Sequence, residues 1–301
     1  MGAPNLASEQ VAAACPKAAK IGSPVRGGQK QVFPCEIDGT RYALKFLATD
    51  PTVPADAEGL SEEPFDEVLS RARREIAIMA TSVSPHLVKL GPIPLSHTEI
   101  GGQRLVYFTE EWIEGDDLRT CISRGALPIA DVVRLGIHIC LAIEELWKLR
   151  KVHRDIKPGN IMIRGSSGDF VLLDLGMAFD LDDDSLSDFG VVPGTLKYFS
   201  PEQTDYTKKR ALDFRSDLFA LGIVMYEAAT GSHPFVSRGM SSHQALAAIL
   251  NAPVIPPKTL RPELPEMLDE IIIRLLAKRP HLRYRRCEDL RAALAAVQVG
   301  A

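Results

Sequence analysis

Residues 153–160 read His-Arg-Asp-Ile-Lys-Pro-Gly-Asn, and three of these side chains suit chemistry on hydroxyl and phosphoryl groups. Asp155 is a carboxylate that could accept the proton of a hydroxyl. Lys157 supplies positive charge for a phosphoryl group in transfer, and Asn160 offers a neutral carbonyl oxygen to a hard cation such as Mg²⁺. These types and this spacing make the segment the strongest candidate for a catalytic site.

The flanking sequence predicts how this segment is held. Pro158 and Gly159 indicate a loop, because neither residue continues a helix. Residues 131–149 precede the loop and are apolar nearly all round, a pattern that predicts a buried helix. Residues 161–163 follow it as a strand-like apolar run. Loops held by rigid elements are common places for chemistry.

The segment resembles the catalytic loop of protein kinases, whose pattern is H-R-D-x-x-x-x-N. A lysine two residues after the aspartate, as at Lys157, is the serine/threonine-kinase form. The resemblance implies that Asp155 accepts a serine or threonine proton, that Lys157 steadies the phosphoryl group, and that Asn160 holds Mg²⁺. The alternative is a turn that carries these residues by chance, and the motifs described next weigh against it.

Ala43-Leu44-Lys45 lies in a strand predicted at residues 42–46, after a hairpin turn at Asp38-Gly39. The motif resembles the V-A-I-K strand of kinases, which implies that Lys45 holds the α- and β-phosphates of ATP. An exposed strand lysine is the alternative interpretation.

The periodicity of apolar residues predicts a helix that starts near Pro64. Glu75 falls at the edge of its apolar stripe, where a carboxylate needs a partner. The resemblance implies that this partner is Lys45. Arg71, four residues earlier on the same helix, is the alternative.

The Gly-rich loop of kinases, G-x-G-x-x-G-x-V, aligns only in part with residues 25–32. Gly27 takes the middle glycine position and Gly28 follows it, so both are assigned to ATP binding by the resemblance. Val25 and Lys30 occupy the outer two positions. Lys30 could add positive charge beside the phosphates or could simply be solvated.

Strands are predicted at residues 87–93 and 104–109, joined through Gly101-Gly102. The residues that follow resemble the kinase hinge, where backbone groups meet the adenine; this assigns Glu111 and Ile113 to ATP binding.

The same alignment makes Glu110 the gatekeeper, or Thr109 if the register is shifted by one residue. A charged gatekeeper needs a buried partner.

Asp174-Leu175-Gly176 follows a predicted strand at residues 171–173 and resembles the D-F-G motif, with Leu in place of Phe. The resemblance implies that Asp174 shares the Mg²⁺ ion with Asn160. Residues 194–202 resemble the end of the activation loop, which implies that Thr195 hydrogen-bonds near Asp155 and Lys157.

Two more pairings follow from the resemblance. Asp217 matches the aspartate that anchors the backbone of the catalytic loop, and Arg283 matches the arginine that pairs with Glu202. Ordinary surface charges are the alternative for both.

Residues 180–188 form an acidic stretch around Ser185 and Ser187. A phosphate added among these carboxylates would meet like-charge repulsion. The hypothesis is that Asp184 or Asp188 pairs with Arg154 and gives activity without phosphorylation. The alternative is a solvated acidic loop, activated in the ordinary way by phosphorylation.

The composition is that of an ordinary globular protein, with 301 residues, 46% hydrophobic and 25% charged. The net charge of −4 disfavours general nucleic-acid binding, and the basic residues within 274–291 favour a solvated helical face. Five scattered cysteines indicate free thiols. The longest apolar run, residues 218–226, is too short to span a membrane, and no signal peptide is evident, so a cytoplasmic location is expected.

The resemblance covers residues 20–295 and implies one α+β, bilobal kinase domain. Its first lobe, residues 20–112, should be an antiparallel sheet with one helix, and its second, residues 113–301, mainly helical. Residues 1–19 are expected to be an extension. ATP should bind at the hinge and pass its γ-phosphate to a protein serine or threonine; the sequence does not predict an oligomeric state.

Two other functions fit the same sequence. A pseudokinase, which binds nucleotide as a signalling module, would explain the degraded Gly-rich loop. A small-molecule kinase on a related fold is the other alternative, although such enzymes usually lack the arginine found here at Arg154 and the Gly-Thr and Ser-Pro-Glu motifs.

Overall fold

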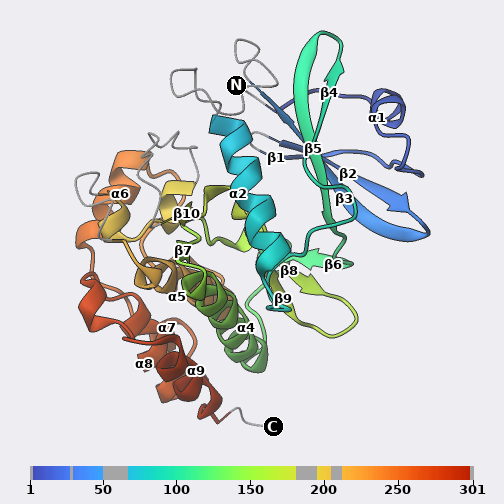
Figure 1. Ribbon diagram of the computed structural model, residues 1–301. Helices are drawn as coiled ribbons and strands as arrows, with labels where there is room; N and C mark the ends of the chain where they lie inside the picture. The colour runs from blue at the N-terminus through green and yellow to red at the C-terminus, as the bar shows by residue number, and fades with distance from the viewer. Residues whose placement is uncertain (1–2, 28–29, 50–66, 181–194, 205–211, 299–301) are drawn as a thin grey trace. The chain divides into compact units, whose positions relative to one another are not determined.

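The computed structural model describes residues 3–27, 30–49, 67–180, 195–204 and 212–298 (Figure 1). The chain divides into two compact units. The first unit comprises Met1–Thr81 and Val88–Trp112, and the second comprises Ser82–Leu87 and Ile113–Ala301. Each unit is described separately below.

The first unit contains a five-stranded antiparallel sheet in the order β1-β2-β3-β5-β4. Its strands are β1 Val25–Gly27, β2 Lys30–Ile37, β3 Thr40–Ala48, β4 Ser96–Ile100 and β5 Gln103–Glu111. The predicted hairpin turn is confirmed, because Asp38 and Gly39 join β2 to β3 with φ angles of 51° and 78°. Such positive φ angles fit the type of turn that asparagine, aspartate and glycine favour between antiparallel strands.

Helix α2, Glu67–Thr81, is the predicted helix of this unit, and its expected start near Pro64 lies outside the described residues. Its buried side chains include Ala72, Glu75 and Met79, at spacings that place them on one face. The helix therefore brings one carboxylate inward together with its apolar residues.

The strand predicted at residues 87–93 is wrong. This segment makes single bridges only, one of them between Leu90 and Glu110, and the regular strand beside β5 is β4. Pro92 and Pro94 lack the N–H group that a continuous ladder requires, which accounts for the irregular backbone. The predicted turn at Gly101-Gly102 is present, between β4 and β5.

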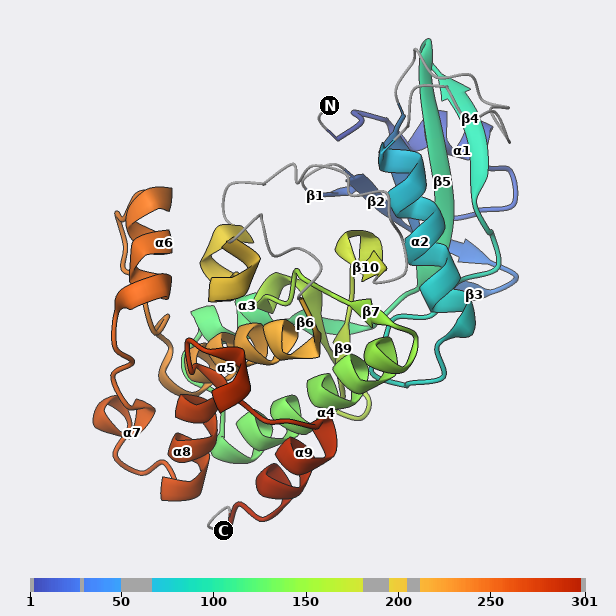
Figure 2. The same ribbon diagram turned by 60° about the vertical axis from the view of Figure 1, so that its left-hand side comes forward.

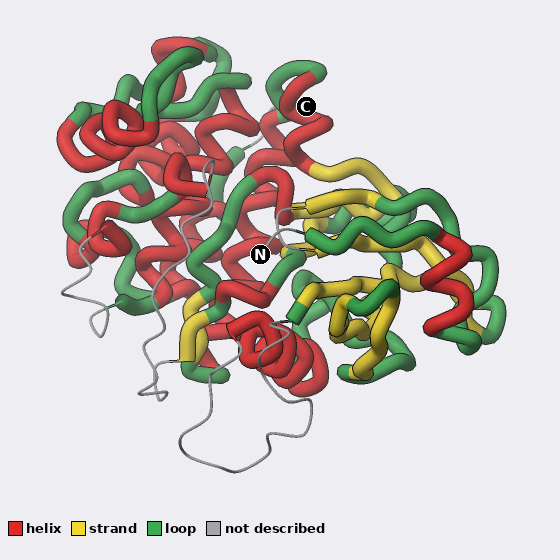
Figure 3. The backbone as a smooth tube through the Cα atoms, turned by 90° about the horizontal axis from the view of Figure 1, so that it is seen from above, coloured by secondary structure: helices red, strands yellow, loops and turns green. Residues whose placement is uncertain are grey.

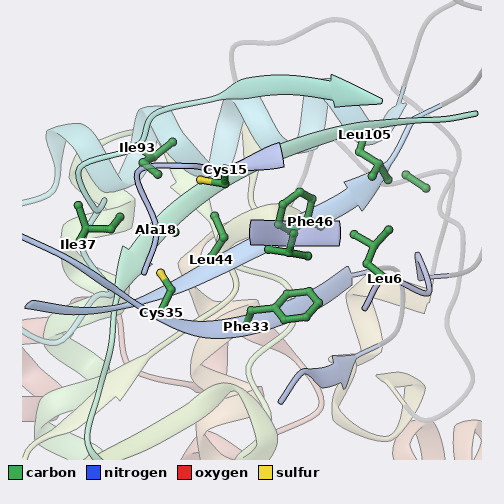
Figure 4. Packing of buried hydrophobic residues seen from close by; sticks show 12 residues of the cluster. Leu6, Cys15, Ala18, Phe33, Cys35, Ile37, Leu44, Phe46, Ile93 and Leu105 are labelled. Carbon is green, nitrogen blue, oxygen red and sulfur yellow. The ribbon is translucent and has the colours of Figure 1, made fainter. Parts of the chain in front are cut away.

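Residues within 6–18 pack into the core of the first unit. Helix α1, Ser8–Ala14, and its flanking residues contribute Leu6, Cys15 and Ala18 to the cluster that contains Phe33 and Phe46 (Figure 4).

Gln31, which is fully buried, fixes this segment. Its side-chain oxygen accepts the backbone N–H of Leu6 at 2.8 Å, and its side-chain nitrogen donates to the carbonyl of Leu6 at 3.0 Å. One amide thus satisfies both backbone groups of Leu6 in an apolar environment.

The second unit is mainly helical, whereas strands dominate the first, as the red and yellow segments of Figure 3 show. Its helices are α3 Leu118–Ser123, α4 Ile129–Lys148, α5 Phe214–Thr230, α6 Ser242–Asn251, α7 Pro257–Leu260, α8 Glu266–Leu275 and α9 Cys287–Ala295. Its strands are β6 Gly115–Asp117, β7 Lys151–Val152, β8 Ile161–Arg164, β9 Phe170–Leu172 and β10 Phe179–Asp180. The predicted α+β class, with a sheet unit and a helical unit, is confirmed.

Helix α4 packs against α5 and α9 (Figure 2). The prediction of a buried helix before the catalytic loop is confirmed, since only Ala130, Arg134 and Lys148 are exposed along α4. The chain leaves α4 at Leu149 and reaches the loop through β7, while β8 carries it away. Rigid elements therefore hold both ends of the catalytic loop.

Candidate active site

The catalytic loop brings together three of the predicted site residues. Lys157 Nζ lies 2.9 and 2.7 Å from the two carboxylate oxygens of Asp155. The side-chain nitrogen of Asn160 donates to Asp155 Oδ2 and to the Asp155 carbonyl, both at 2.9 Å. A cation and an amide therefore fix the orientation of the Asp155 carboxylate. Asp155 is 5% exposed, so it still reaches the surface.

His153 is a structural residue whose role the sequence analysis did not identify. Its Nδ1 accepts the backbone N–H of Asp155 at 3.2 Å, so the ring proton belongs on Nε2, which contacts the Leu173 carbonyl at 3.1 Å. The ring is completely buried. His153 therefore ties the catalytic loop to the residue that precedes Asp174.

Asp217, at the start of α5, anchors the loop as predicted. Its two carboxylate oxygens accept the backbone N–H groups of His153 and Arg154, each at 2.8 Å. Burial raises the pKa of the Asp217 carboxyl, while nearby His153 and the two backbone hydrogen bonds act in the opposite direction. The contact fixes the backbone immediately before Asp155.

Two non-glycine residues with left-handed backbone lie in these motifs. Arg154 has φ 69° and Asp174 has φ 62°. Such conformations cost on the order of 1–3 kcal/mol each and persist where neighbouring contacts over-determine them. For Arg154 those contacts are Asp217 and Gln203, whose side-chain nitrogen donates to the Arg154 carbonyl at 3.1 Å. Left-handed backbone of this kind therefore lies directly before Asp155 and at Asp174.

Asp174 follows β9 and precedes a 3-10 turn, Leu175–Met177. The backbone N–H of Leu173 donates to the Asn160 carbonyl at 2.8 Å, which connects this motif to the catalytic loop. Leu175, which takes the place of Phe in the D-F-G pattern, is fully buried.

The side chains of Asn160 and Asp174 suit a magnesium ion chemically. Asn160 uses its amide nitrogen on Asp155, so its carbonyl oxygen points away from that contact. One amide oxygen and one carboxylate are a suitable protein contribution for Mg²⁺, which commonly takes its other ligands from water and phosphates.

The first unit holds the predicted ion pair. Lys45 Nζ lies 2.8 Å from Glu75 Oε1, and the two side chains are 2% and 4% exposed. The prediction that Lys45, rather than Arg71, is the partner of Glu75 is confirmed. Strand β3 supplies the lysine and helix α2 the carboxylate, so the pair joins the sheet to the helix.

Lys45 also meets a second carboxylate. Glu110 Oε2 lies 2.6 Å from Lys45 Nζ, and the Glu110 side chain is 6% exposed. Lys45 is paired with Phe108 across β3 and β5, so Glu110, two residues further along β5, lies on the same face of the sheet. Thr109 points to the other face, where its hydroxyl oxygen accepts the N–H of Ile93 at 2.8 Å. Glu110 therefore occupies the position beside Lys45, and Lys45 is its buried partner.

The other residues assigned to nucleotide binding have these places. Gly27 ends β1, and Gly28 lies outside the described residues. Glu111 ends β5, and its N–H donates to the Lys89 carbonyl at 2.9 Å. Ile113 is buried in the second unit.

Thr195 begins a 3-10 turn, and its side chain is not among those described. Ser185, Ser187, Asp184 and Asp188 lie outside the described residues, so the hypothesis about their contact with Arg154 stays a prediction.

The predicted pair of Arg283 and Glu202 is confirmed. Arg283 is 1% exposed and meets both carboxylate oxygens of Glu202, at 2.6 and 2.9 Å. Ser216 donates a further hydrogen bond to Glu202 Oε1 at 2.9 Å. The segment after the activation loop is thereby fixed to the helices that follow it.

Two findings bear on the predictions made from composition. None of the five cysteines is in a disulfide. Among the helices that the structure describes, none combines the length and the apolar character needed to cross a lipid bilayer.

Comparison with known proteins gives one family and several relatives. The family described as "Protein kinase domain" matches residues 18–293. The chain is 31% identical over 227 residues to the probable serine/threonine-protein kinase CPE1738 of Clostridium perfringens, which covers 75% of this chain and 31% of the relative.

Two further relatives cover similar regions. Serine/threonine-protein kinase PknE of Mycobacterium bovis is 33% identical over 273 residues, 89% of this chain and 44% of the relative. The probable serine/threonine-protein kinase PknB of Bifidobacterium longum is 34% identical over 233 residues, 75% of this chain and 33% of the relative. The alignments thus span less than half the length of these curated relatives.

Proposed function

Because the chain belongs to the protein kinase family, we propose that it is a serine/threonine protein kinase of the bacterial, eukaryotic-like type. It transfers the γ-phosphate of ATP to a serine or threonine hydroxyl of a protein, itself included. The observation that carries this proposal is the arrangement of Asp155, Lys157 and Asn160, in which a fixed carboxylate lies beside a cation and an amide.

In this proposal Asp155 orients the acceptor hydroxyl and accepts its proton. Its distances of 2.9 and 2.7 Å to Lys157 support the role, because the lysine fixes the orientation of the carboxylate and brings positive charge beside it for a phosphoryl group in transfer. Asp217 and His153 hold the loop in this geometry through the backbone contacts described above.

Asn160 and Asp174 are the proposed Mg²⁺ ligands. A bound Mg²⁺ ion would neutralise charge on the phosphates. The chain's contribution is an oxygen donor from each of two segments, and the hydrogen bond from Leu173 to Asn160 supports their placement in one unit.

Lys45, positioned by Glu75, is proposed to hold the α- and β-phosphates. Gly27 and Gly28 are assigned to the phosphates, and the backbone of Glu111 and Ile113 to the adenine, by the family pattern. Thr195 is proposed to hydrogen-bond near the catalytic loop. A cytoplasmic location and the lack of a nucleic-acid partner stay predictions from composition.

The two alternative functions, a pseudokinase and a small-molecule kinase, are weighed by different features of the chain. A pseudokinase interpretation draws support from the missing outer glycines at Val25 and Lys30. Against it stand the pairing of Lys45 with Glu75 and the contacts of Asp155. A small-molecule kinase is disfavoured by the buried pair of Arg283 and Glu202, which completes a motif of the protein-kinase pattern.

The test incubates the full chain with Mg²⁺ and γ-labelled ATP and locates new phosphate on protein by mass spectrometry. Wild type should label serine or threonine, and Asp155→Asn should fall by about 10²–10⁴-fold, the usual loss for a positioned base. Asp38→Asn, at an exposed turn, is the matched control and should behave as wild type. Equal labelling by wild type and Asp155→Asn, both folded, would overturn the role of Asp155; no labelling by wild type would favour a pseudokinase.

A further inference from the structure

The buried centre of the first unit has two carboxylates and one cation in mutual contact. Lys45 Nζ is 2.8 Å from Glu75 and 2.6 Å from Glu110, and all three side chains are at most 6% exposed. With all three ionised, this cluster carries a net charge of −1 in a place that excludes water. Burying an uncompensated charge is costly, so one of the two carboxylates is poised to bind a proton.

Glu110 is the carboxylate better placed to bind that proton. Burial raises the pKa of Glu110 most strongly, and Glu75 raises it further, whereas Lys45 and the more distant Lys30 lower it. The neighbouring groups come from three elements: Glu75 from α2, Lys45 from β3 and Lys30 from β2. The ionised form of Glu110 is therefore stabilised mainly by the positive charge of Lys45.

Phosphate groups at Lys45 would change this balance. The ammonium of Lys45 lies within ion-pair distance of both Glu75 and Glu110. A phosphate that binds beside Lys45 shares its positive charge and adds negative charge near both carboxylates. The ionised form of Glu110 is then opposed by burial, by Glu75 and by the phosphate together.

We propose that Glu110 couples nucleotide binding to proton uptake: its carboxylate, ionised beside Lys45 in the free protein, takes one proton from solvent when phosphates bind Lys45. The carboxylate becomes a neutral carboxylic acid, and no other bond changes. Glu110 is thus a positioning residue that acts through Lys45. The inference rests on the proposed function, because it requires that Lys45 binds nucleotide phosphates.

This proposal fixes how nucleotide affinity should depend on pH. Below the pKa of Glu110 in the free protein, Glu110 is already protonated and the affinity for nucleotide is highest. Between that pKa and the higher pKa of the complex, affinity falls by up to about tenfold per pH unit, the limit for one linked proton. Above both values the affinity is low and constant. A Glu110 that only neutralised Lys45 would show none of this linkage.

Calorimetric titration of the full chain with MgADP measures the linkage without phosphoryl transfer. Each titration is run in two buffers of different ionisation enthalpy, at a series of pH values at which the chain stays folded. For each MgADP bound, wild type should take up close to one proton after the protonation of MgADP itself is subtracted. Glu110→Gln should not take up this proton. Glu99→Gln, an exposed change on β4 of the same sheet, is the control and should match wild type.

The outcomes separate the two proposals. Equal proton uptake by wild type and Glu110→Gln overturns the inference while nucleotide binding stands. If Glu110→Gln does not fold, wild type alone decides, since uptake no larger than that of MgADP in free solution overturns it as well. If wild type binds no MgADP at any pH, the proposed function fails and the inference fails with it.

Discussion

Arg283 and Glu202 form a two-point ion pair across 81 residues of sequence, with nitrogen–oxygen distances of 2.6 and 2.9 Å. The arginine also donates to the backbone carbonyls of Ala277 and Arg215, at 2.9 and 2.7 Å. A planar guanidinium can serve all these acceptors at once, whereas a lysine ammonium cannot reproduce the fork. The pair thus joins the segment at η4, Pro201–Thr204, to α5 and to the turn before α9.

We expect Arg283→Met to reduce the unfolding free energy of the second unit by on the order of 3–5 kcal/mol, because Glu202 is left partly buried without its cation. Denaturant unfolding followed by circular dichroism measures the loss. Arg286→Met, which removes an exposed pair with Asp289, is the control and should change stability little. Similar denaturation midpoints for Arg283→Met and Arg286→Met would show that the buried pair stabilises the fold no more than the exposed pair does.

Lys45 and Glu75 should act as one unit in phosphoryl transfer. Lys45→Met is expected to lower kcat/KM by on the order of 10²–10³-fold, as for the loss of one positioned charge. Adding Glu75→Gln to that variant should cost little more, because Glu75 acts through Lys45. Initial rates with γ-labelled ATP give the comparison.

The matched control for this pair is Lys20→Met with Glu36→Gln, an ion pair of similar length with an exposed lysine in the same unit. It should leave the rates unchanged. If the fold-loss in kcat/KM of the double variant equals the product of the losses of Lys45→Met and Glu75→Gln, Glu75 has a separate role.

Asp217→Asn should slow phosphoryl transfer while nucleotide affinity changes little. An asparagine side chain has one carbonyl oxygen, so one of the two backbone N–H groups of His153 and Arg154 would face an amide nitrogen. A small displacement of Asp155 can cost on the order of 10²-fold in rate. Steady-state kinetics should show the loss in kcat.

Asp213→Asn serves as the control for Asp217→Asn. Asp213 caps the same helix by accepting the backbone N–H of Arg215, and asparagine caps helices equally well. A loss of kcat in this variant as large as that of Asp217→Asn would contradict a specific anchor role for Asp217.

His138 should make the second unit less stable in acid. Burial, together with the stacked ring of His86 at 4.1 Å between centroids, lowers the pKa of His138 to about 4. The unfolded chain binds this proton at about 6.5, so the stabilisation is complete above that pH and is lost as pH falls toward 4. The loss is on the order of 3 kcal/mol.

Thermal unfolding from neutral to acidic pH measures this effect. His138→Asn should lose less stability than wild type over that interval, whereas His243→Asn, at an exposed position on α6, should follow the wild-type curve. Parallel curves for wild type and His138→Asn would rule out His138 as the source.

The sequence predicted the contacts that belong to recognisable motifs. The pairs Lys45–Glu75 and Arg283–Glu202, and the anchor at Asp217, are all present in the structure. Each joins segments far apart in the chain, and periodicity alone could place only Glu75 at a boundary of burial. The resemblance supplied the partners.

Other features required three-dimensional packing. The sequence showed that Glu110 needs a buried partner, but its proximity to Lys45 depends on the register of β3 and β5. Residues 87–93 read as a strand because they are apolar, although Pro92 prevents a regular ladder. His153 and the stacked pair of His86 and His138 gave no periodic signal at all.

The two hydrogen bonds between Gln31 and Leu6 join the residues by which the family is recognised to a residue that precedes them. The family pattern begins at residue 18, yet Leu6, Val11 and Cys15 belong to the apolar cluster around Phe33. A shortened protein that began at residue 18 would keep every motif by which its family is recognised. It would also open the sheet's apolar surface to water and leave the buried amide of Gln31 without its backbone partner. For this protein, the apolar core of the first unit begins before the residues that the family pattern matches.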